Sequence, residues 1–240
     1  MPQRESQAFN IRLATRAAVC WDVPLSEKSG SGMQRQIDYY FSLSSPWAYI
    51  GHRAFRKVVS DYNCKVNCKP VMLGDLFSET GGLPLVKRHP VRQRYRLLEM
   101  QRWRDKRGLV FHMKPAHVPF NPTLADQVVI AMIAEGHDPE PFLSRAFPAV
   151  WEQQRDLADS ETLVALAEEA GLPGRSLIER AGSSDIAAIY ASNREDAVAA
   201  DVFGAPVYVL DGEAFWGQDR IELLADALKS QRKPYRPVVS

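Results

Sequence analysis

Residues 203–220 read FGAPVYVLDGEAFWGQDR, and this stretch decides the fold. Asp211-Gly212 stands between two apolar runs, a strong short-range signal for a β-hairpin. Pro206 opens the first run although proline cannot donate to a sheet ladder, and a cis peptide bond is one reason for such a placement. Asp219 precedes the apolar-periodic residues 220–224, so it is the expected N-cap of a final helix. The stretch therefore predicts a strand, a tight turn, a second strand and a helix.

A second informative stretch lies earlier in the chain. Residues 37–41, IDYYF, predict a buried strand, and Ser45-Pro46 is a typical opening for a helix that extends to about Ser60. A further strand is expected over about 65–73. A strand, a helix and a second strand form a right-handed crossover unit.

Between about residues 90 and 200 the pattern is helical, with breaks at Pro and Gly. The expected helices cover residues 95–107, 123–135, 140–156, 161–170, 175–181 and 185–200. The order of elements, with Pro206 at the head of the third strand, is the thioredoxin arrangement. We therefore expect an α/β, thioredoxin-like fold with an inserted all-helical domain.

The expected domain boundaries follow from this order. The thioredoxin-like domain takes residues 36–80 and 201–230, the helical domain takes 81–200, and 231–240 form a C-terminal tail. Residues 1–35 lack periodicity and contain a Ser-Gly-Ser-Gly linker at 29–32, so they are expected to be a disordered extension, upstream of a natural start near Met33.

Composition narrows the class of protein. The 240 residues are 45% hydrophobic and 25% charged, as in an ordinary soluble globular protein. A net charge of +1 gives no reason to expect nucleic acid or an anionic membrane, and no apolar run reaches the ~18 residues that span a bilayer. Cys20, Cys64 and Cys68 are too few for a disulfide framework and have no metal-site spacing, so a reducing, cytoplasmic location is expected.

Ser45-Pro46-Trp47-Ala48 stands where a disulfide oxidoreductase of this fold carries Cys-x-x-Cys. Both cysteines are absent, which excludes thiol–disulfide exchange at this position. A hydroxyl at a helix N-terminus remains. Backbone N–H groups and the helix dipole there favour an anion, such as a thiolate supplied by a ligand.

Residues 38–49, DYYFSLSSPWAY, resemble the opening of 2-hydroxychromene-2-carboxylate isomerases, and residues 203–220 resemble their second signature. That family belongs with kappa-class glutathione transferases and DsbA-like thioredoxin folds, and the resemblance covers roughly residues 36–230. It implies glutathione as cofactor, a small aromatic carboxylate as substrate, and isomerisation by reversible thiolate addition. It also allows a homodimer. A kappa-like glutathione S-transferase and a non-catalytic thioredoxin-fold binding protein are the alternatives.

The resemblance implies roles for five residues. Ser45 corresponds to the serine that hydrogen-bonds the glutathione sulfur and holds it as thiolate. Ala205, before the expected cis Pro206, would pair its backbone with the cysteinyl unit, as an added strand does. Gln218 and Asp219 lie where the family grips the γ-glutamyl end.

Some residues keep plainer alternatives. Ser45 can be only a helix cap, Asp219 only an N-cap, and hairpin packing is favoured over substrate stacking for Trp216. Nine Lys and Arg fall within residues 87–107, where a solvated helix face is favoured, although one or two could bind ligand carboxylates.

Residues 80–84 and the histidines leave two points open. Relatives place an Asn in a Gly-Asn-x-Pro-Pro turn, whereas residues 80–84 here read TGGLP, so the substrate subclass stays open. His89, His112, His117 and His137 match no metal motif, and none is assigned a role.

Overall fold

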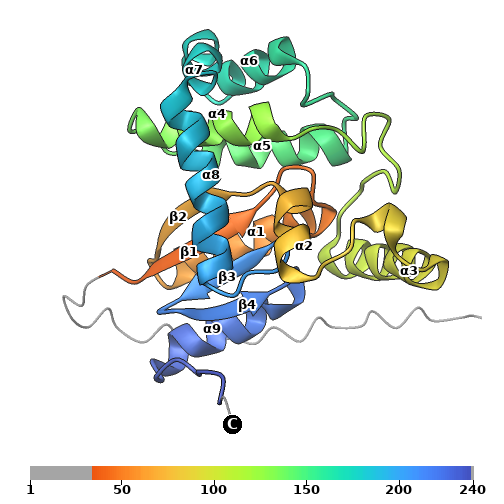
Figure 1. Ribbon diagram of the computed structural model, residues 1–240, viewed down its shortest axis with the longest axis vertical. Helices are drawn as coiled ribbons and strands as arrows, with labels where there is room; N and C mark the ends of the chain where they lie inside the picture. Colours follow the sequence, from red (N-terminus) through yellow and green to blue (C-terminus); the bar gives the residue numbers. More distant parts are fainter. Residues whose placement is uncertain (1–33, 239–240) are drawn as a thin grey trace, which may run out of the picture. The chain divides into compact units, whose positions relative to one another are not determined.

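The computed structural model describes residues 34–238 (Figure 1). Cys20, Met33 and most of the expected N-terminal extension lie outside the described residues. A four-stranded sheet has the order β2-β1-β3-β4. Its strands are β1 (Gln36–Phe41), β2 (Lys65–Pro70), β3 (Val207–Leu210) and β4 (Glu213–Trp216). β1 is parallel to β2 and antiparallel to β3, which confirms the thioredoxin-like order expected from the sequence.

The first crossover unit packs one helix against the sheet. Helix α1 (Pro46–Asp61) begins directly after Ser45 and returns the chain to β2, where Ile37 stands opposite Val66. Side chains alternate along β1, so Tyr39 faces α1 and stacks on Tyr208 with 5.3 Å between ring centroids. The expected strand, helix and strand are confirmed.

The hairpin forms where Asp211-Gly212 predicts it. Asp211 and Gly212 have φ of 51° and 78°, the left-handed pair that a two-residue type I′ turn requires. The expected N-cap at Asp219 is wrong. Asp219 lies inside a 3-10 turn, η2 (Gln218–Arg220), and helix α9 begins only at Ile221. A residue already inside a helical turn cannot take the extended conformation of an N-cap.

Seven helices and a 3-10 turn lie between β2 and β3 in the described chain. They are α2 (Leu73–Thr80), η1 (Leu85–Lys87), α3 (Pro90–Arg107), α4 (Thr123–Ala134), α5 (Glu140–Trp151), α6 (Ser160–Glu169), α7 (Gly174–Ala181) and α8 (Ser184–Ala199).

Three boundaries differ from the sequence expectation. Helix α3 begins at Pro90 rather than at residue 95, because proline is favoured at the first helical position. The second strand ends at Pro70 rather than about residue 73, because Leu73 opens α2, which the sequence analysis missed. Helix α5 ends at Trp151 rather than at residue 156, and Gln154, with φ of 57°, turns the chain away from a helical path.

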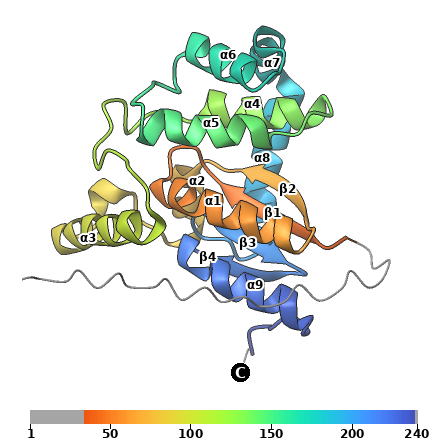
Figure 2. The same cartoon turned by 180° about the vertical axis from the view of Figure 1, so that it is seen from behind.

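Helices cover both faces of the sheet. α1 and α9 contact each other on one face (Figure 2), and α2 and α8 lie over the other (Figure 1). The second face buries Tyr40 of β1 and Val207 of β3 with Leu76 of α2 and Ala197 of α8. In the part of the chain that is described, no helix has both the length and the apolar content to cross a membrane.

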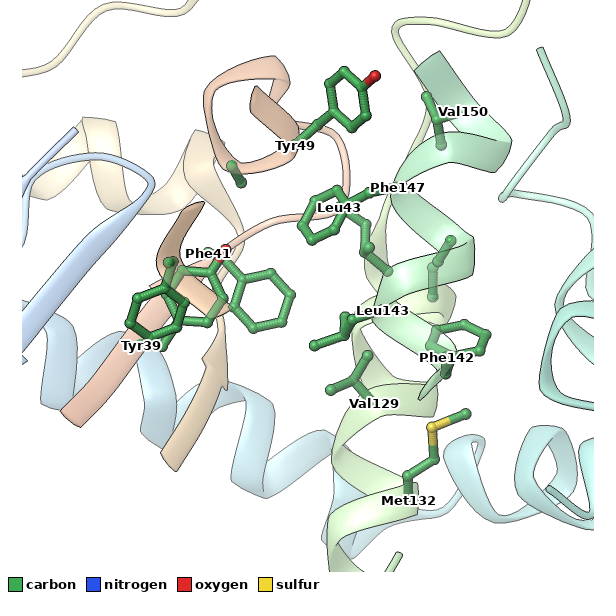
Figure 3. Packing of buried hydrophobic residues seen from close by; sticks show 14 of the residues in the cluster. Tyr39, Phe41, Leu43, Tyr49, Val129, Met132, Phe142, Leu143, Phe147 and Val150 are labelled. Atoms are coloured by element: carbon green, nitrogen blue, oxygen red, sulfur yellow. The ribbon is translucent and has the colours of Figure 1, made fainter. Parts of the chain in front are cut away.

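The main core is continuous from the sheet into the helical segment. Phe41 and Leu43, at the end of β1, approach Leu143 and Phe147 of α5, with Val129 of α4 beside them (Figure 3). The loop after β1 is therefore held between the sheet and α4–α5. This packing positions the start of α1.

Candidate functional site

A cavity of about 460 Å³ opens at the N-terminus of α1. Its walls come from this N-terminus, from α2 and α3, from residues 118–120, and from the segments before β3 and after β4. A volume of this size suits a small-molecule site. Ser45, Ala205, Gln218 and Asp219 all line the cavity, whereas Pro206 does not.

Ser45 is both the cap of α1 and part of the cavity wall. Its extended backbone (φ −87°, ψ 117°) brings the side-chain Oγ within 3.3 Å of the Ala48 N–H, from which it accepts a hydrogen bond. The same hydroxyl donates to the Ala205 carbonyl at 3.4 Å, and Ser45 is 3% exposed. The hydroxyl thus lies where the α1 dipole favours an anion.

The Ala205-Pro206 peptide bond is cis, as expected. The Ala205 carbonyl accepts the Ser45 hydroxyl, and the Pro206 carbonyl accepts the Gly217 N–H at 2.9 Å. Residues from the start of α1, the head of β3 and the end of β4 therefore meet at one edge of the cavity, although they are far apart in the chain.

Gln218 is held under α1 and is 2% exposed. A Cβ placed on Gly51 of α1 would lie only 2.7 Å from the Gln218 Cβ, so the helix and the turn are in close contact. Nη2 of Arg107 donates to the Gln218 backbone carbonyl at 3.2 Å and to its Oε1 at 3.4 Å. These contacts fix the η2 turn.

Asp219 lines the cavity with its carboxylate beside a cation. Nη1 of Arg220 donates to Oδ2 of Asp219, and the carboxylate folds back toward Gly217, whose φ is 100°. The Asp219 charge is thus paired within its own turn.

Trp216, on β4, has two environments. Its ring meets the Phe203 ring edge-on at 4.5 Å between centroids, which agrees with the expected hairpin packing. It also lines the cavity, and a Cβ on Gly204 would lie 2.8 Å from its Nε1. Glycine at 204 therefore leaves the space that the indole occupies.

Asp126 supports the loop that leads from β1 to Ser45, and its role was not predicted from the sequence. It is fully buried on α4, where Oδ1 accepts the Leu43 N–H at 3.3 Å and Oδ2 accepts the Tyr190 hydroxyl at 2.9 Å. Burial raises the pKa of Asp126 to about 8, although these hydrogen bonds act in the opposite direction. The signal was an Asp within the apolar helix TLADQVVIAMIA.

The structure divides the cations of residues 87–107 into those that line the cavity and those that do not. Arg88 and Arg96 line the cavity together with Glu99 and Trp103, whereas Lys87, Arg92 and Arg94 are not among its lining residues. Their position depends on how α3 packs, which composition alone does not specify.

The cysteines and histidines contribute little to this cavity. Burial raises the pKa of Cys68 to about 12, so the thiol stays protonated at neutral pH. Neither Cys68 nor Cys64, nor any of the five histidines, is a lining residue. Within residues 34–238 no group of three or more His, Cys, Asp or Glu is placed to hold a metal ion.

A family model described as the DSBA-like thioredoxin domain matches residues 36–229. The chain belongs to the DSBA-like thioredoxin family. The match spans both the sheet and the helices between β2 and β3, in agreement with the fold described above.

Two curated relatives show the resemblance stated from the sequence. The 2-hydroxychromene-2-carboxylate isomerase of Sphingobium xenophagum is 27% identical over 198 residues, which are 82% of this chain and 99% of that protein. Glutathione S-transferase kappa 1 of Homo sapiens is 22% identical over 214 residues, which are 82% of this chain and 92% of that protein. The expected resemblance to both groups is confirmed.

Solved structures confirm the fold. A structure of 2-hydroxychromene-2-carboxylate isomerase has a TM-score of 0.72 at 22% identity and covers 82% of this chain and 95% of that one. The cytosolic disulfide reductase DsbM from Pseudomonas aeruginosa, solved with GSH, has a TM-score of 0.58 at 15% identity and covers 82% and 98%. At these identities the likeness concerns the fold alone.

Proposed function

We propose that this DSBA-like protein is a glutathione-dependent isomerase of 2-hydroxychromene-2-carboxylate or of a related intermediate of aromatic degradation. One observation carries the proposal. The Ser45 hydroxyl stands at the N-terminus of α1, on the wall of a cavity and beside the carbonyl that precedes cis Pro206. The curated isomerases align over nearly their whole length, which supports an isomerase-like enzyme.

The residues present fit glutathione. The hydrogen bond from Ser45 to the Ala205 carbonyl is long, at 3.4 Å, so the hydroxyl can redirect its proton to an incoming sulfur. The helix N-terminus stabilises negative charge at the same place. Gln218 and Asp219 of the η2 turn line the same cavity as Ser45, and in the proposed mode they receive the γ-glutamyl end of the tripeptide.

Bound glutathione would supply a thiolate that adds reversibly to a conjugated carbon, so that the former double bond can rotate before the thiolate leaves unchanged. Ser45 donates its proton in a hydrogen bond that holds sulfur as the anion. Ala205 offers backbone groups to the peptide, and the carboxylate of Asp219 attracts its ammonium group. The apolar walls exclude water while these groups hold the two ligands in contact.

Three finer expectations belong to this proposal. The substrate is a small aromatic carboxylate, the protein works as a cytoplasmic enzyme where glutathione is kept reduced, and homodimer formation is compatible with both. The division into residues 36–80 with 201–230 and residues 81–200 is part of the same proposal.

A kappa-like glutathione S-transferase is the second candidate, because relatives with that name also align over most of their length. It would use the same thiolate but release the adduct. The two candidates differ in whether glutathione is consumed.

The deciding experiment supplies substrate in large excess over glutathione and follows both by chromatography. An isomerase turns over many substrate molecules for each glutathione and leaves the glutathione intact. Loss of one glutathione for each product molecule would support the transferase instead. A thermal-shift titration with glutathione comes first, since a ligand that binds the native state raises the apparent stability. Absence of any shift would support a non-catalytic protein.

A further inference from the structure

The charges around the cavity do not cancel. Its charged lining residues are Arg88, Arg96, Glu99, Asp219 and Arg220. Glu99 is paired with Arg102 outside the lining, and Asp219 is paired with Arg220. Arg88 and Arg96 form no ion pair within residues 34–238. The cavity therefore holds two guanidinium groups whose charge no described side chain offsets.

Both guanidinium groups are partly removed from water. Burial lowers the pKa of Arg96, and the nearby charge of Arg88 lowers it further. Burial also lowers the pKa of Arg88, with a smaller effect from Arg92. For both cations the causes of the lowered pKa are desolvation and repulsion by a neighbouring arginine, so an anion bound between them would stabilise both charges.

Arg88 is already oriented by neutral contacts. Its Nε donates to the Leu83 carbonyl at 2.7 Å, and its guanidinium carbon lies 5.7 Å from the centre of the Phe77 ring. No described group accepts a hydrogen bond from its two Nη atoms. Phe77 and Trp103 line the same cavity and provide apolar surface beside the cations.

The other cations of residues 87–107 are engaged elsewhere or lie off the cavity. Arg104 pairs with Asp105, Lys106 pairs with Glu222, and Arg107 donates to Gln218. Arg92 does not line the cavity. The sequence left open which of these cations could bind a ligand carboxylate, and the structure leaves Arg88 and Arg96 as the candidates.

We propose that Arg96 and Arg88 form a carboxylate subsite that binds the acid group of the aromatic substrate, while its ring lies against Phe77 and Trp103. This inference rests on the proposed function and names a specificity-determining pair within it. A guanidinium matches the two oxygens of a carboxylate in a bidentate contact, and such charge-assisted hydrogen bonds are strong in a partly dry site.

The test is a titration with a matched pair of stable bicyclic probes, chromone-2-carboxylate and neutral chromone-2-carboxamide, followed by calorimetry without glutathione. The unaltered protein should prefer the carboxylate by about tenfold or more, as expected for a hydrogen bond to a charged group. Arg96→Gln and Arg88→Gln should each remove most of that preference. Arg92→Gln, on the same helix but off the cavity, should keep it.

Three results would overturn the subsite. The first is a carboxylate preference in Arg96→Gln equal to that of the unaltered protein. The second is a loss of preference in Arg92→Gln as large as that in Arg96→Gln, and the third is no binding of chromone-2-carboxylate at all. A parallel glutathione titration identifies the ligand of the pair: if its affinity falls in Arg96→Gln as much as that of chromone-2-carboxylate, the cations serve glutathione and the proposal fails. Circular dichroism and thermal unfolding confirm that each variant is folded.

The subsite and the proposed function can fail separately. The probe titration needs neither glutathione nor turnover, so a retained carboxylate preference with no glutathione binding would contradict the proposed function alone. Glutathione-dependent turnover without a carboxylate preference would contradict the subsite alone.

Discussion

The two sides of the cavity are built in different ways. On one side, Ser45, Ala205 and the η2 turn are connected by backbone geometry: a helix start, a cis peptide bond and a short 3-10 turn. On the other side, Arg88, directly after η1, and Arg96, on α3, line the cavity together with the apolar side chains of Phe77 and Trp103. Asp219 on the first side is paired with Arg220, whereas Arg88 and Arg96 on the second side have no ion-pair partner in the described part of the chain.

This difference indicates that the two sides of the cavity bind different ligands. Backbone groups and a helix N-terminus are rigid, so they suit a cofactor that is the same in every turnover. Flexible cationic side chains can instead adjust to substrates of different shape. We therefore assign the Ser45 side to glutathione and the Arg96 side to the substrate. Four substitutions on the Ser45 side or in its support test this assignment, from the largest expected effect to the smallest.

The largest effect is expected for Ser45→Ala. Loss of the hydroxyl that holds the thiolate should lower glutathione-dependent turnover by roughly 10²–10³-fold, as for removal of a single donor to a developing anion. Ser44→Ala is the matched control, since that hydroxyl also lines the cavity but lies 3.0 Å from the Ser42 hydroxyl. Steady-state assays should find a small change in the control. Equal losses in the two variants would remove the special role of Ser45.

Asp126→Asn tests the buried support of the Ser45 side. Folding keeps Asp126 neutral up to a pKa of about 8, whereas in the unfolded chain it ionises near its ordinary value of 3.8. Between these values the unfolded state is the one that has lost the proton, so the carboxyl makes stability fall as pH rises. The side chain of the Asn variant does not ionise. Its free energy of unfolding should therefore rise relative to that of the unaltered protein, by up to about 1.4 kcal/mol for each pH unit.

Urea unfolding of both proteins at several pH values between 5 and 8 measures this difference. A stability difference that stays constant across the range would show that Asp126 does not titrate there. The glutathione affinity of the variant reports whether the loop from Ser42 to Ser45 has moved.

Gly51→Ala tests the contact between α1 and the η2 turn. Alanine is intrinsically better in a helix by about 1 kcal/mol, but its Cβ would come within 2.7 Å of the Gln218 Cβ. Overpacking should therefore destabilise the protein by about 1–3 kcal/mol and weaken glutathione binding. Gly74→Ala, in α2, is the control because no atom lies within 4 Å of the added methyl. Urea unfolding decides, and equal stabilities in the two variants would contradict the close contact.

Asp219→Ala should have the smallest effect of the four. Loss of the carboxylate is expected to weaken glutathione by about tenfold, because one charge-assisted hydrogen bond to the ammonium is removed. Glu222→Ala, an exposed acid at the start of α9, controls for a general change in charge. Calorimetry measures the glutathione affinity of each variant. If the affinity is unchanged in Asp219→Ala, Asp219 does not bind glutathione and acts only as the ion-pair partner of Arg220.

Features that depend on local backbone rules could be predicted from the sequence. Asp211-Gly212 specifies its turn, Ser45-Pro46 specifies a helix start, and Pro206 indicates the cis bond. The N-cap at Asp219 could not be predicted correctly, because a 3-10 turn over Gln218–Arg220 precedes α9 and moves the helix start by one residue, to Ile221.

Features that depend on packing at long range could not be predicted. Asp126 meets Leu43 across 83 positions of the chain, and Arg107 meets Gln218 across 111. In the same way, the sequence shows nine cations in residues 87–107, but only the placement of α3 and η1 separates Arg88 and Arg96 from the others.

The central claim is that the Ser45 side of the cavity holds glutathione as the thiolate. Ultraviolet difference absorbance of bound glutathione, titrated against pH in the unaltered protein and in Ser45→Ala, measures the thiolate directly. We predict a thiolate signal at neutral pH in the unaltered protein, with the sulfur pKa well below that of free glutathione, and a return toward the free value in Ser45→Ala. Equal thiolate signals in the two proteins, with glutathione bound to both, would contradict the account.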